Sequence, residues 1–162
     1  MNTSIAMGCL GIVILALPLA ARAQQRPDER MAVIAVVDSA LAAVSRTDFG
    51  AFSTFMLPEA VMFAVQHVDS VRGYNATSRQ AVHDTKLTDT FTERGFRHDV
   101  KIAGPVAIAW VPYDFYRNGT WSHCGVDVFT LLRTDGRWRI SSLAYTVAQP
   151  PACEKHPDGP PK

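Results

Sequence analysis

The stretch WSHCGVDVFTLLRTDGRW, residues 121–138, decides the fold of this chain. Apolar and polar residues alternate along it, which is typical of a β-strand, and the run then enters a Thr-Asp-Gly turn. Its first part is unusual, because the alternation places His123 and Asp127 on the same side of the strand, with the bare Gly125 between them. Polar side chains on a face that should meet a core need a partner or a function.

Further runs rich in Val, Ile, Thr and aromatic residues flank this stretch and predict more strands. The expected strands of the last third of the chain are 99–103, 106–116, 121–133 and 138–147. Asn118-Gly119 and Asp135-Gly136 are strong signals for two-residue hairpin turns. The last third is therefore predicted to be a meander of long antiparallel strands.

The first half of the chain has a mixed pattern. The expected elements are helices over 28–46, 49–56 and 77–93, and short strands over 60–66 and 69–73. Pro27 suits the start of the first helix, Asp48 can cap the second, and Pro58 ends it. This order predicts an α+β fold in which N-terminal helices pack in a strongly curved antiparallel sheet.

The N-terminus has the pattern of a secretory signal peptide. An apolar run over 5–19 precedes Ala21-Arg22-Ala23, where a signal peptidase would cut before Gln24. The run is shorter than the roughly 20 apolar residues of a membrane-spanning helix, so no stable membrane anchor is expected after cleavage. We expect an exported protein, periplasmic or secreted. Its parts are a signal peptide (1–23), one domain (24–149) and a partly disordered C-terminal tail (150–162).

Composition and spacing exclude several classes of partner. Sixteen Lys and Arg residues against fifteen Asp and Glu residues give a formal net charge of +1, so no nucleic-acid partner is expected. His67, His83 and His98 do not have the spacing of a metal motif, and we expect neither a metal nor a cofactor. After cleavage Cys124 and Cys153 remain, and an oxidising compartment favours a disulfide between them.

The two hairpin turns predict a register for the strands. His123 should lie opposite Asp114, Asp127 opposite Trp110 and residue 144, and residue 131 opposite 140. One face of the sheet then collects Trp110, Asp114, His123, Asp127, Phe129, Leu131, Trp138 and Ile140. The other collects Tyr113, Phe115, Cys124, Val126, Val128, Leu143 and Tyr145. Both faces are largely apolar, so we expect helices on the first and the partner subunit of a homodimer on the second.

The polar end of the helix-facing side predicts a pocket, with Gly125 leaving a gap in its wall. The candidate ligand-binding residues are Trp110, Gly125, Phe129 and Trp138. Asp127 suits a general acid or base, because burial raises the pKa of an unpaired carboxyl group; the alternative is a hydrogen bond from the indole of Trp110 or Trp138. His123 and Asp114 would form an acid/base dyad or, alternatively, a polar pair that closes the end of the sheet.

The runs WVPYDFYRNG (110–119) and SHCGVDVFTLLRTDGRWRI (122–140) resemble the nuclear transport factor 2-like superfamily, especially its SnoaL-like and steroid-isomerase-like members. Secreted bacterial members of uncharacterised function look most similar. The resemblance covers the chain from about Pro27 to Val147 and implies a cone of helices cradled by a bent sheet. The superfamily includes isomerases, cyclases, dehydratases and hydrolases as well as binding proteins, so fold alone does not choose a function. The acid or base signature of the steroid isomerases is not matched, and no catalytic residue is carried over.

Two functions remain open on this basis. The first is a small-molecule-binding domain with a conical pocket for a largely apolar molecule, working as a cofactor-independent acid/base enzyme of the isomerase, cyclase or dehydratase type. The alternative is a non-catalytic interaction or dimerisation module with a vestigial pocket. A cavity of roughly a few hundred Å³ would support ligand binding, and a collapsed one would favour the interaction module.

Overall fold

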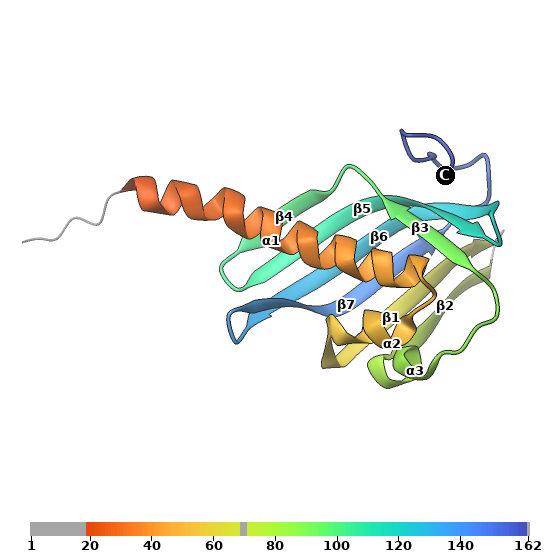
Figure 1. The fold of residues 1–162 in the computed structure, drawn as a ribbon, viewed down its shortest axis with the longest axis horizontal. Helices are drawn as coiled ribbons and strands as arrows, with labels where there is room; N and C mark the ends of the chain where they lie inside the picture. Colours follow the sequence, from red (N-terminus) through yellow and green to blue (C-terminus); the bar gives the residue numbers. More distant parts are fainter. Residues whose placement is uncertain (1–18, 69–70, 162) are drawn as a thin grey trace, which may run out of the picture.

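The structure is a computed structural model that describes the backbone of residues 19–68 and 71–161 and the side chains of residues 28–65 and 73–161. Its elements are α1 (Leu19–Ser45), α2 (Phe49–Thr54), β1 (Met56–Val68), β2 (Val71–Ser78), α3 (Arg79–Asp84), β3 (Phe91–Gly95), β4 (Asp99–Ala103), β5 (Val106–Arg117), β6 (Thr120–Thr134) and β7 (Arg137–Val147). Figure 1 shows α1 crossing one face of a curved sheet, with α2 and α3 beside its C-terminal end. The predicted α+β class is confirmed.

The strands form one seven-stranded sheet in the order β2-β1-β7-β6-β5-β3, with β4 also paired to β5. β3 and β4 pair with different halves of β5. The sheet is mixed, because β1 and β7 are parallel while the other pairs are antiparallel. In this order β7, β6 and β5 form the centre of the sheet, with β1 and β2 on one side of them and β3 and β4 on the other.

Both predicted hairpin turns are confirmed. Asn118 and Gly119 have φ values of 52° and 75°, and Asp135 and Gly136 have 51° and 74°. Two consecutive positive φ angles are the mark of a type I′ turn, whose twist matches that of the strands it joins. The expected pairing of residue 131 with 140 is confirmed as well.

The predicted register is wrong beyond a β-bulge in each hairpin. One residue of each bulged strand, Ser122 and Ser141, has no partner in the ladder. His123 therefore pairs with Phe115 instead of Asp114. Asp127 pairs with Val111 and Tyr145, instead of Trp110 and residue 144. A one-residue slip moves every side chain of the partner strand to the opposite face.

The corrected register exchanges several side chains between the faces. Tyr113, Phe115, Leu143 and Tyr145 lie on the concave side with His123 and Asp127. Trp110 and Asp114 lie on the outer side. The expectation of Tyr113 and Tyr145 as outer-face aromatics is therefore wrong.

The apolar core lies between α1 and the concave side of the sheet. Val33, Val37, Ala40 and Val44 recur at helical spacing and are buried. They belong to one cluster with buried residues of the long strands, Phe129, Leu131 and Ile140 among them. Strand β3 approaches α1 so closely that a Cβ atom on Gly95 would lie 2.7 Å from Leu41.

Several predicted boundaries differ from those observed. α1 begins at Leu19, before the expected start after Pro27, and residues 1–18 of the predicted signal peptide lie outside the described residues. The third helix is only α3, capped by Ser78, whose hydroxyl accepts from the Ala81 N–H at 3.3 Å. Thr77 and Ser78 end strand β2, and the part of the predicted helix after α3 is loop and strand β3, because residues 91–95 pair with β5. Of the described helices, none is long and apolar enough to cross a membrane.

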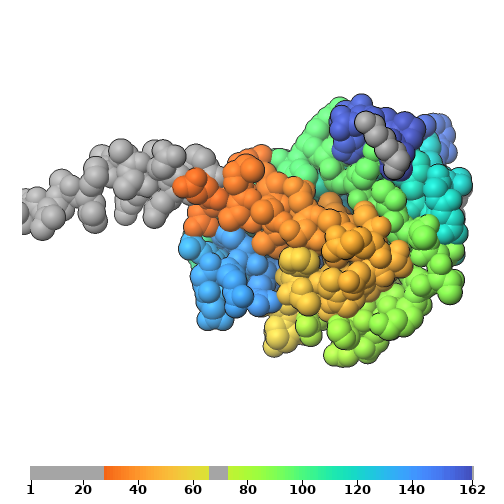
Figure 2. Space-filling view, viewed as in Figure 1, coloured from red at the N-terminus to blue at the C-terminus, as the bar shows by residue number. Residues whose placement is uncertain are grey.

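The C-terminal tail is attached to the outer side of the sheet. The predicted disulfide between Cys124 and Cys153 is confirmed, with Cα atoms 5.9 Å apart. Glu154 pairs with Arg97 at 2.7 Å, and the Lys155 ammonium lies 4.1 Å from the centroid of the Trp121 ring. Figure 2 shows this tail in dark blue over one end of the molecule.

Candidate functional site

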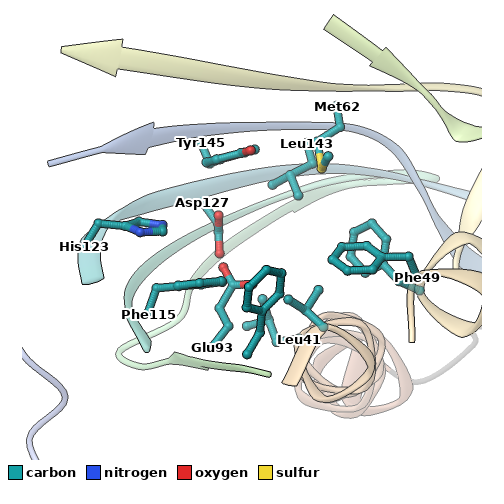
Figure 3. A pocket seen from close by; sticks show the side chains of 12 residues that line it. Leu41, Phe49, Met62, Glu93, Phe115, His123, Asp127, Leu143 and Tyr145 are labelled. Carbon is teal, nitrogen blue, oxygen red and sulfur yellow. The ribbon is translucent and has the colours of Figure 1, made fainter. Parts of the chain in front are cut away.

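A cavity of about 160 Å³ lies between the helices and the concave side of the sheet (Figure 3). It is lined by Leu41, Val44, Phe49, Phe52, Met62, Phe91, Glu93, Phe115, His123, Asp127, Leu143 and Tyr145. Most of these side chains are apolar or aromatic. Glu93, His123 and Asp127 are the exceptions that carry acid/base chemistry, and the cavity is therefore an apolar space with a polar wall.

The carboxyl groups of Glu93 on β3 and Asp127 on β6 point toward one another in this wall (Figure 3). Strand β5 lies between β3 and β6 in the sheet, so the two acids reach each other across its concave side. Ser45, at the end of α1, fixes the backbone of Glu93: its hydroxyl donates to the Glu93 carbonyl and accepts from the Glu93 N–H, both at 2.8 Å. The helix thus holds one acid of the pair in place.

Asp127 is buried, with 1% of its surface exposed, and its Oδ2 atom has no hydrogen-bond partner among the described residues. Glu93 is half-buried as a residue, but its carboxyl end turns inward to the cavity. Burial raises the pKa of Asp127 well above its usual range, and the neighbouring Glu93 raises it further. Burial also raises the pKa of Glu93, to about 8. Two carboxyl groups so placed titrate as a unit and hydrogen-bond to each other only when one holds a proton.

The indole alternative for Asp127 is wrong. The Trp138 Nε1–H donates to Glu29 Oε2 at 2.9 Å, at the other end of the core. Trp110 is 51% exposed on the outer side of the sheet. Asp127 therefore keeps the raised pKa that was expected of an unpaired buried carboxyl group.

His123 lies in the cavity wall among aromatic side chains. Its ring stacks on Phe115, with centroids 4.4 Å apart and planes 20° apart, and meets the Tyr113 ring edge-on at 5.8 Å. Its Nδ1 atom lies 3.1 Å from the Ser122 hydroxyl oxygen. Burial lowers the pKa of His123, so the imidazole is neutral at pH 7.

The predicted dyad of His123 and Asp114 does not form, because the bulge at Ser122 puts them on opposite sides of the sheet. Asp114 is fully buried on the outer side and accepts two hydrogen bonds from Arg94, at 3.0 and 2.5 Å. A third comes from the backbone N–H of His156 in the tail, at 3.2 Å. Asp114 is part of the contact between tail and sheet.

Gly125 leaves room for a neighbouring strand instead of a ligand. A Cβ atom there would lie 2.0 Å from the Thr146 carbonyl oxygen, which accepts a hydrogen bond from the Tyr113 hydroxyl at 2.8 Å. Among the other predicted ligand-binding residues, Phe129 is buried in the core, and Trp138 lines a separate surface hollow near Phe55. Of the predicted site residues, His123 and Asp127 line the cavity.

Glu93 is absent from the predicted site, because residues 77–93 are predicted to form a helix. The period-two spacing of Phe91, Glu93 and Gly95, which puts all three on one face of a strand, is the signal that indicates its place. Tyr145 is also absent from the predicted site; its pKa is raised by burial and then by the two neighbouring acids. Across residues 28–65 and 73–161, no group of three or more His, Cys, Asp or Glu side chains is arranged to hold a metal ion.

Comparison with known proteins agrees with this architecture. The model of the SnoaL-like domain family matches residues 33–148. A solved NTF2-like protein of unknown function from Silicibacter pomeroyi is 22% identical, with a TM-score of 0.54, and the match covers 76% of this chain and 98% of that one. An NTF2-like protein with a cystatin-like fold from Novosphingobium aromaticivorans is 19% identical, with a TM-score of 0.63 and coverage of 88% and 95%.

A third similar structure is the β subunit of a putative aromatic-ring-hydroxylating dioxygenase from Novosphingobium aromaticivorans. It is 12% identical, with a TM-score of 0.63 and coverage of 82% of this chain and 93% of that one. The comparison with curated proteins gave no match. The family match spans the core, the cavity and the long strands, and the chain belongs to the SnoaL-like domain family.

Proposed function

We propose that this chain binds a small, largely apolar molecule in the cavity and moves a proton on it with the Glu93–Asp127 pair. The observation that carries the proposal is the pair of carboxyl groups in the cavity wall, those of buried Asp127 and of Glu93, which point toward one another. Two buried acids so close repel each other when both are ionised, which favours a state in which they share a proton. Such groups with perturbed pKa values gather at functional sites.

The pair supplies both halves of acid/base catalysis. When it holds one proton, the protonated carboxyl group is an acid and the ionised one is a base. The raised pKa values of both groups bring this state toward neutral pH, where proton transfer is most effective. Removing a proton from one atom of the ligand and returning it to another is an isomerisation, and returning it to a leaving hydroxyl group is a dehydration.

The size of the cavity limits the ligand. Its volume of about 160 Å³ is below the few hundred Å³ typical of drug-sized ligands, but it is not collapsed. An engineered apolar cavity of about 150 Å³ binds benzene, so a molecule of one ring fits here. The ligand is therefore smaller than a steroid or a polyketide.

Proton exchange on a cyclic ketone tests the proposal. Wild-type protein should accelerate deuterium incorporation at the carbon beside the carbonyl group of cyclohexanone in D₂O, followed by NMR. Asp127→Asn should lower that rate by about 10²-fold or more, because the amide cannot take a proton. Glu59→Gln, which changes an exposed acid outside the cavity, is the matched control. Equal rates for wild type, Asp127→Asn and buffer would remove the catalytic part of the proposal.

A second proposal concerns the outer side of the sheet. Val106, Ile108 and Trp110 alternate along β5 and are 40%, 45% and 51% exposed, so they form a continuous apolar strip. Such a strip is typical of a contact surface. We propose that it joins two copies of this chain in a homodimer, which is also the basis of the alternative function as an interaction module.

We also propose that the chain is exported. The disulfide between Cys124 and Cys153 supports this, since such bonds persist in oxidising compartments. The mature protein should then begin at Gln24. Intact-mass analysis of protein from the periplasm or culture medium of the expressing cells checks this, and an uncleaved N-terminus in exported material would contradict the predicted site.

A further inference from the structure

The wall of the cavity contains acidic side chains but no basic one. Among the twelve residues that line the cavity, two are acids and none is Lys or Arg. Arg94 follows Glu93 in the sequence, but it lies on the outer side of the sheet with Asp114. The pair therefore has no protein cation in the cavity wall, and an anionic ligand would meet only repulsion there.

Each element packed around the pair contributes few ionisable groups. α1, α2 and β1 present apolar side chains, namely Leu41, Val44, Phe49, Phe52 and Met62. The strands present His123, which burial keeps neutral, and two tyrosines, Tyr113 and Tyr145, whose pKa values burial raises. The two acids are thus the groups of the wall that change charge near neutral pH.

The rest of the wall is rich in aromatic rings. Phe91 meets Phe115 at 5.0 Å and Phe49 at 6.2 Å between ring centroids, and Phe115 stacks on His123. The face of an aromatic ring carries partial negative charge and attracts cations. Acids at one side and aromatic rings around them favour a ligand with a positive, hydrogen-bond-donating group on an apolar body.

We infer that the ligand of this cavity is a small primary or secondary amine, bound as its ammonium ion through Glu93 and Asp127, with one apolar ring or short chain against the phenylalanines. The inference rests on the proposed function only in taking the cavity as a ligand site. Once both acids are ionised they have no proton to share, and an ammonium N–H then donates to their oxygens, Asp127 Oδ2 among them. The apolar body fills a space of about 160 Å³, which limits it to about one ring.

Binding of an ammonium ion should change the protonation of the pair. The positive charge favours the ionised form of a carboxyl group, so the pair loses a proton as the amine binds. Affinity should therefore rise with pH while the pair still holds protons, until the amine itself loses its charge. A neutral ligand of the same shape should not show this rise.

Isothermal titration with benzylamine, benzyl alcohol and benzoate tests the inference on the purified protein. Benzylamine should bind about tenfold tighter than benzyl alcohol, because its hydrogen bonds are charge-assisted, and benzoate should not bind. Titrations in buffers of different ionisation enthalpy should show proton release with benzylamine alone. Equal affinities for benzylamine and benzyl alcohol would overturn the amine inference and leave the ligand site standing. Binding of none of the three would overturn both.

Two variants test whether the preference for benzylamine arises at the carboxyl pair. Asp127→Asn and Glu93→Gln should each remove the preference for benzylamine and the proton release, while benzyl alcohol binding is retained and reports an intact cavity. Glu59→Gln should behave as wild type, since this acid is exposed and outside the cavity wall. A benzylamine preference that survives in both cavity variants would place the amine elsewhere and overturn the inference.

Discussion

Two aspartates, Asp114 and Asp127, are buried on opposite sides of the same sheet, and their surroundings differ. Asp114 accepts from the Arg94 guanidinium and from the His156 backbone. Asp127 meets a second acid, Glu93, and its Oδ2 atom has no donor among the described residues. A buried acid paired with a cation and fully hydrogen-bonded suits a structural role, whereas buried acids with raised pKa values beside a cavity are candidates for a functional site. Both aspartates are buried, so the difference between them lies in the groups that contact their carboxyl oxygens.

The largest change in the free energy of unfolding should come from removing Asp114, the aspartate whose hydrogen bonds are satisfied. Asp114→Ala leaves the Arg94 guanidinium, which is 20% exposed, without its partner. We expect a loss of about 3–5 kcal/mol in the free energy of unfolding, measured by urea denaturation. Asp127→Asn should change that free energy by less, or raise it, because it removes a buried ionisable group. Equal losses of unfolding free energy for Asp114→Ala and Asp127→Asn would contradict the difference between the two aspartates.

The second largest change in the free energy of unfolding should come from releasing the C-terminal tail, which is attached to the outer side of the sheet beside Asp114. Cys153→Ser opens a link between residues 29 positions apart. We expect a loss of about 2–4 kcal/mol in the free energy of unfolding, because the unfolded chain regains freedom. Reduced wild-type protein should match the variant, while ligand binding in the cavity, which lies on the other side of the sheet, should be retained. A tail variant that lost ligand binding would show that the two sides are coupled.

The Glu93–Asp127 pair should make the stability of the protein depend on pH. The pKa of Glu93 is about 8 in the folded protein and about 4.3 in an unfolded chain, so the folded state binds more protons between these values. The free energy of unfolding then has its full contribution from Glu93 below about pH 4.3 and loses it as pH rises toward 8, by about 1.4 kcal/mol for each pH unit in this range. Thermal unfolding from pH 5 to 8 measures the slope. Glu93→Gln and Asp127→Asn should flatten it, and an unchanged slope in both would contradict the raised pKa values.

The smallest change in stability should come from the outer apolar strip. Trp110→Arg alters an exposed side chain and should change the free energy of unfolding by no more than about 0.5 kcal/mol. The same variant should dissociate the proposed homodimer, which sedimentation velocity measures. Gln80→Arg, which adds the same charge at an exposed position on α3, is the control for added charge. A wild-type protein that sediments as a monomer would contradict the dimer.

The strand pattern and the turns could be read from the sequence because they depend on neighbouring residues. Alternation marks the long strands, and a two-residue turn with two positive φ angles accepts few residues other than Asn, Asp and Gly. The buried, raised-pKa state of Asp127 was also predictable, since alternation put it on a covered face. The disulfide was predictable from the two cysteines that remain after the expected signal cleavage.

Most of the candidate site was not predictable, because it depends on two β-bulges and on the pairing of distant strands. Ser122 and Ser141 are the unpaired residues that shift His123 and Asp127 to new partners, and nothing in the hairpin sequences requires a bulge there. Glu93 was missed because its strand exists through pairing with β5, some twenty residues further along the chain. Local pattern does not contain that contact.

By itself, the sequence determined the long strands of the last third of the chain, the two hairpin turns and that one acid is buried, because these depend on side-chain period and local backbone preference. The tertiary structure alone decided which acid meets which partner. Strand register and the docking of β3 beside β5 arise from packing the whole curved sheet around α1, and a shift of one residue exchanges the two faces. The pairing of Glu93 with Asp127, and of Asp114 with Arg94, follows from that packing.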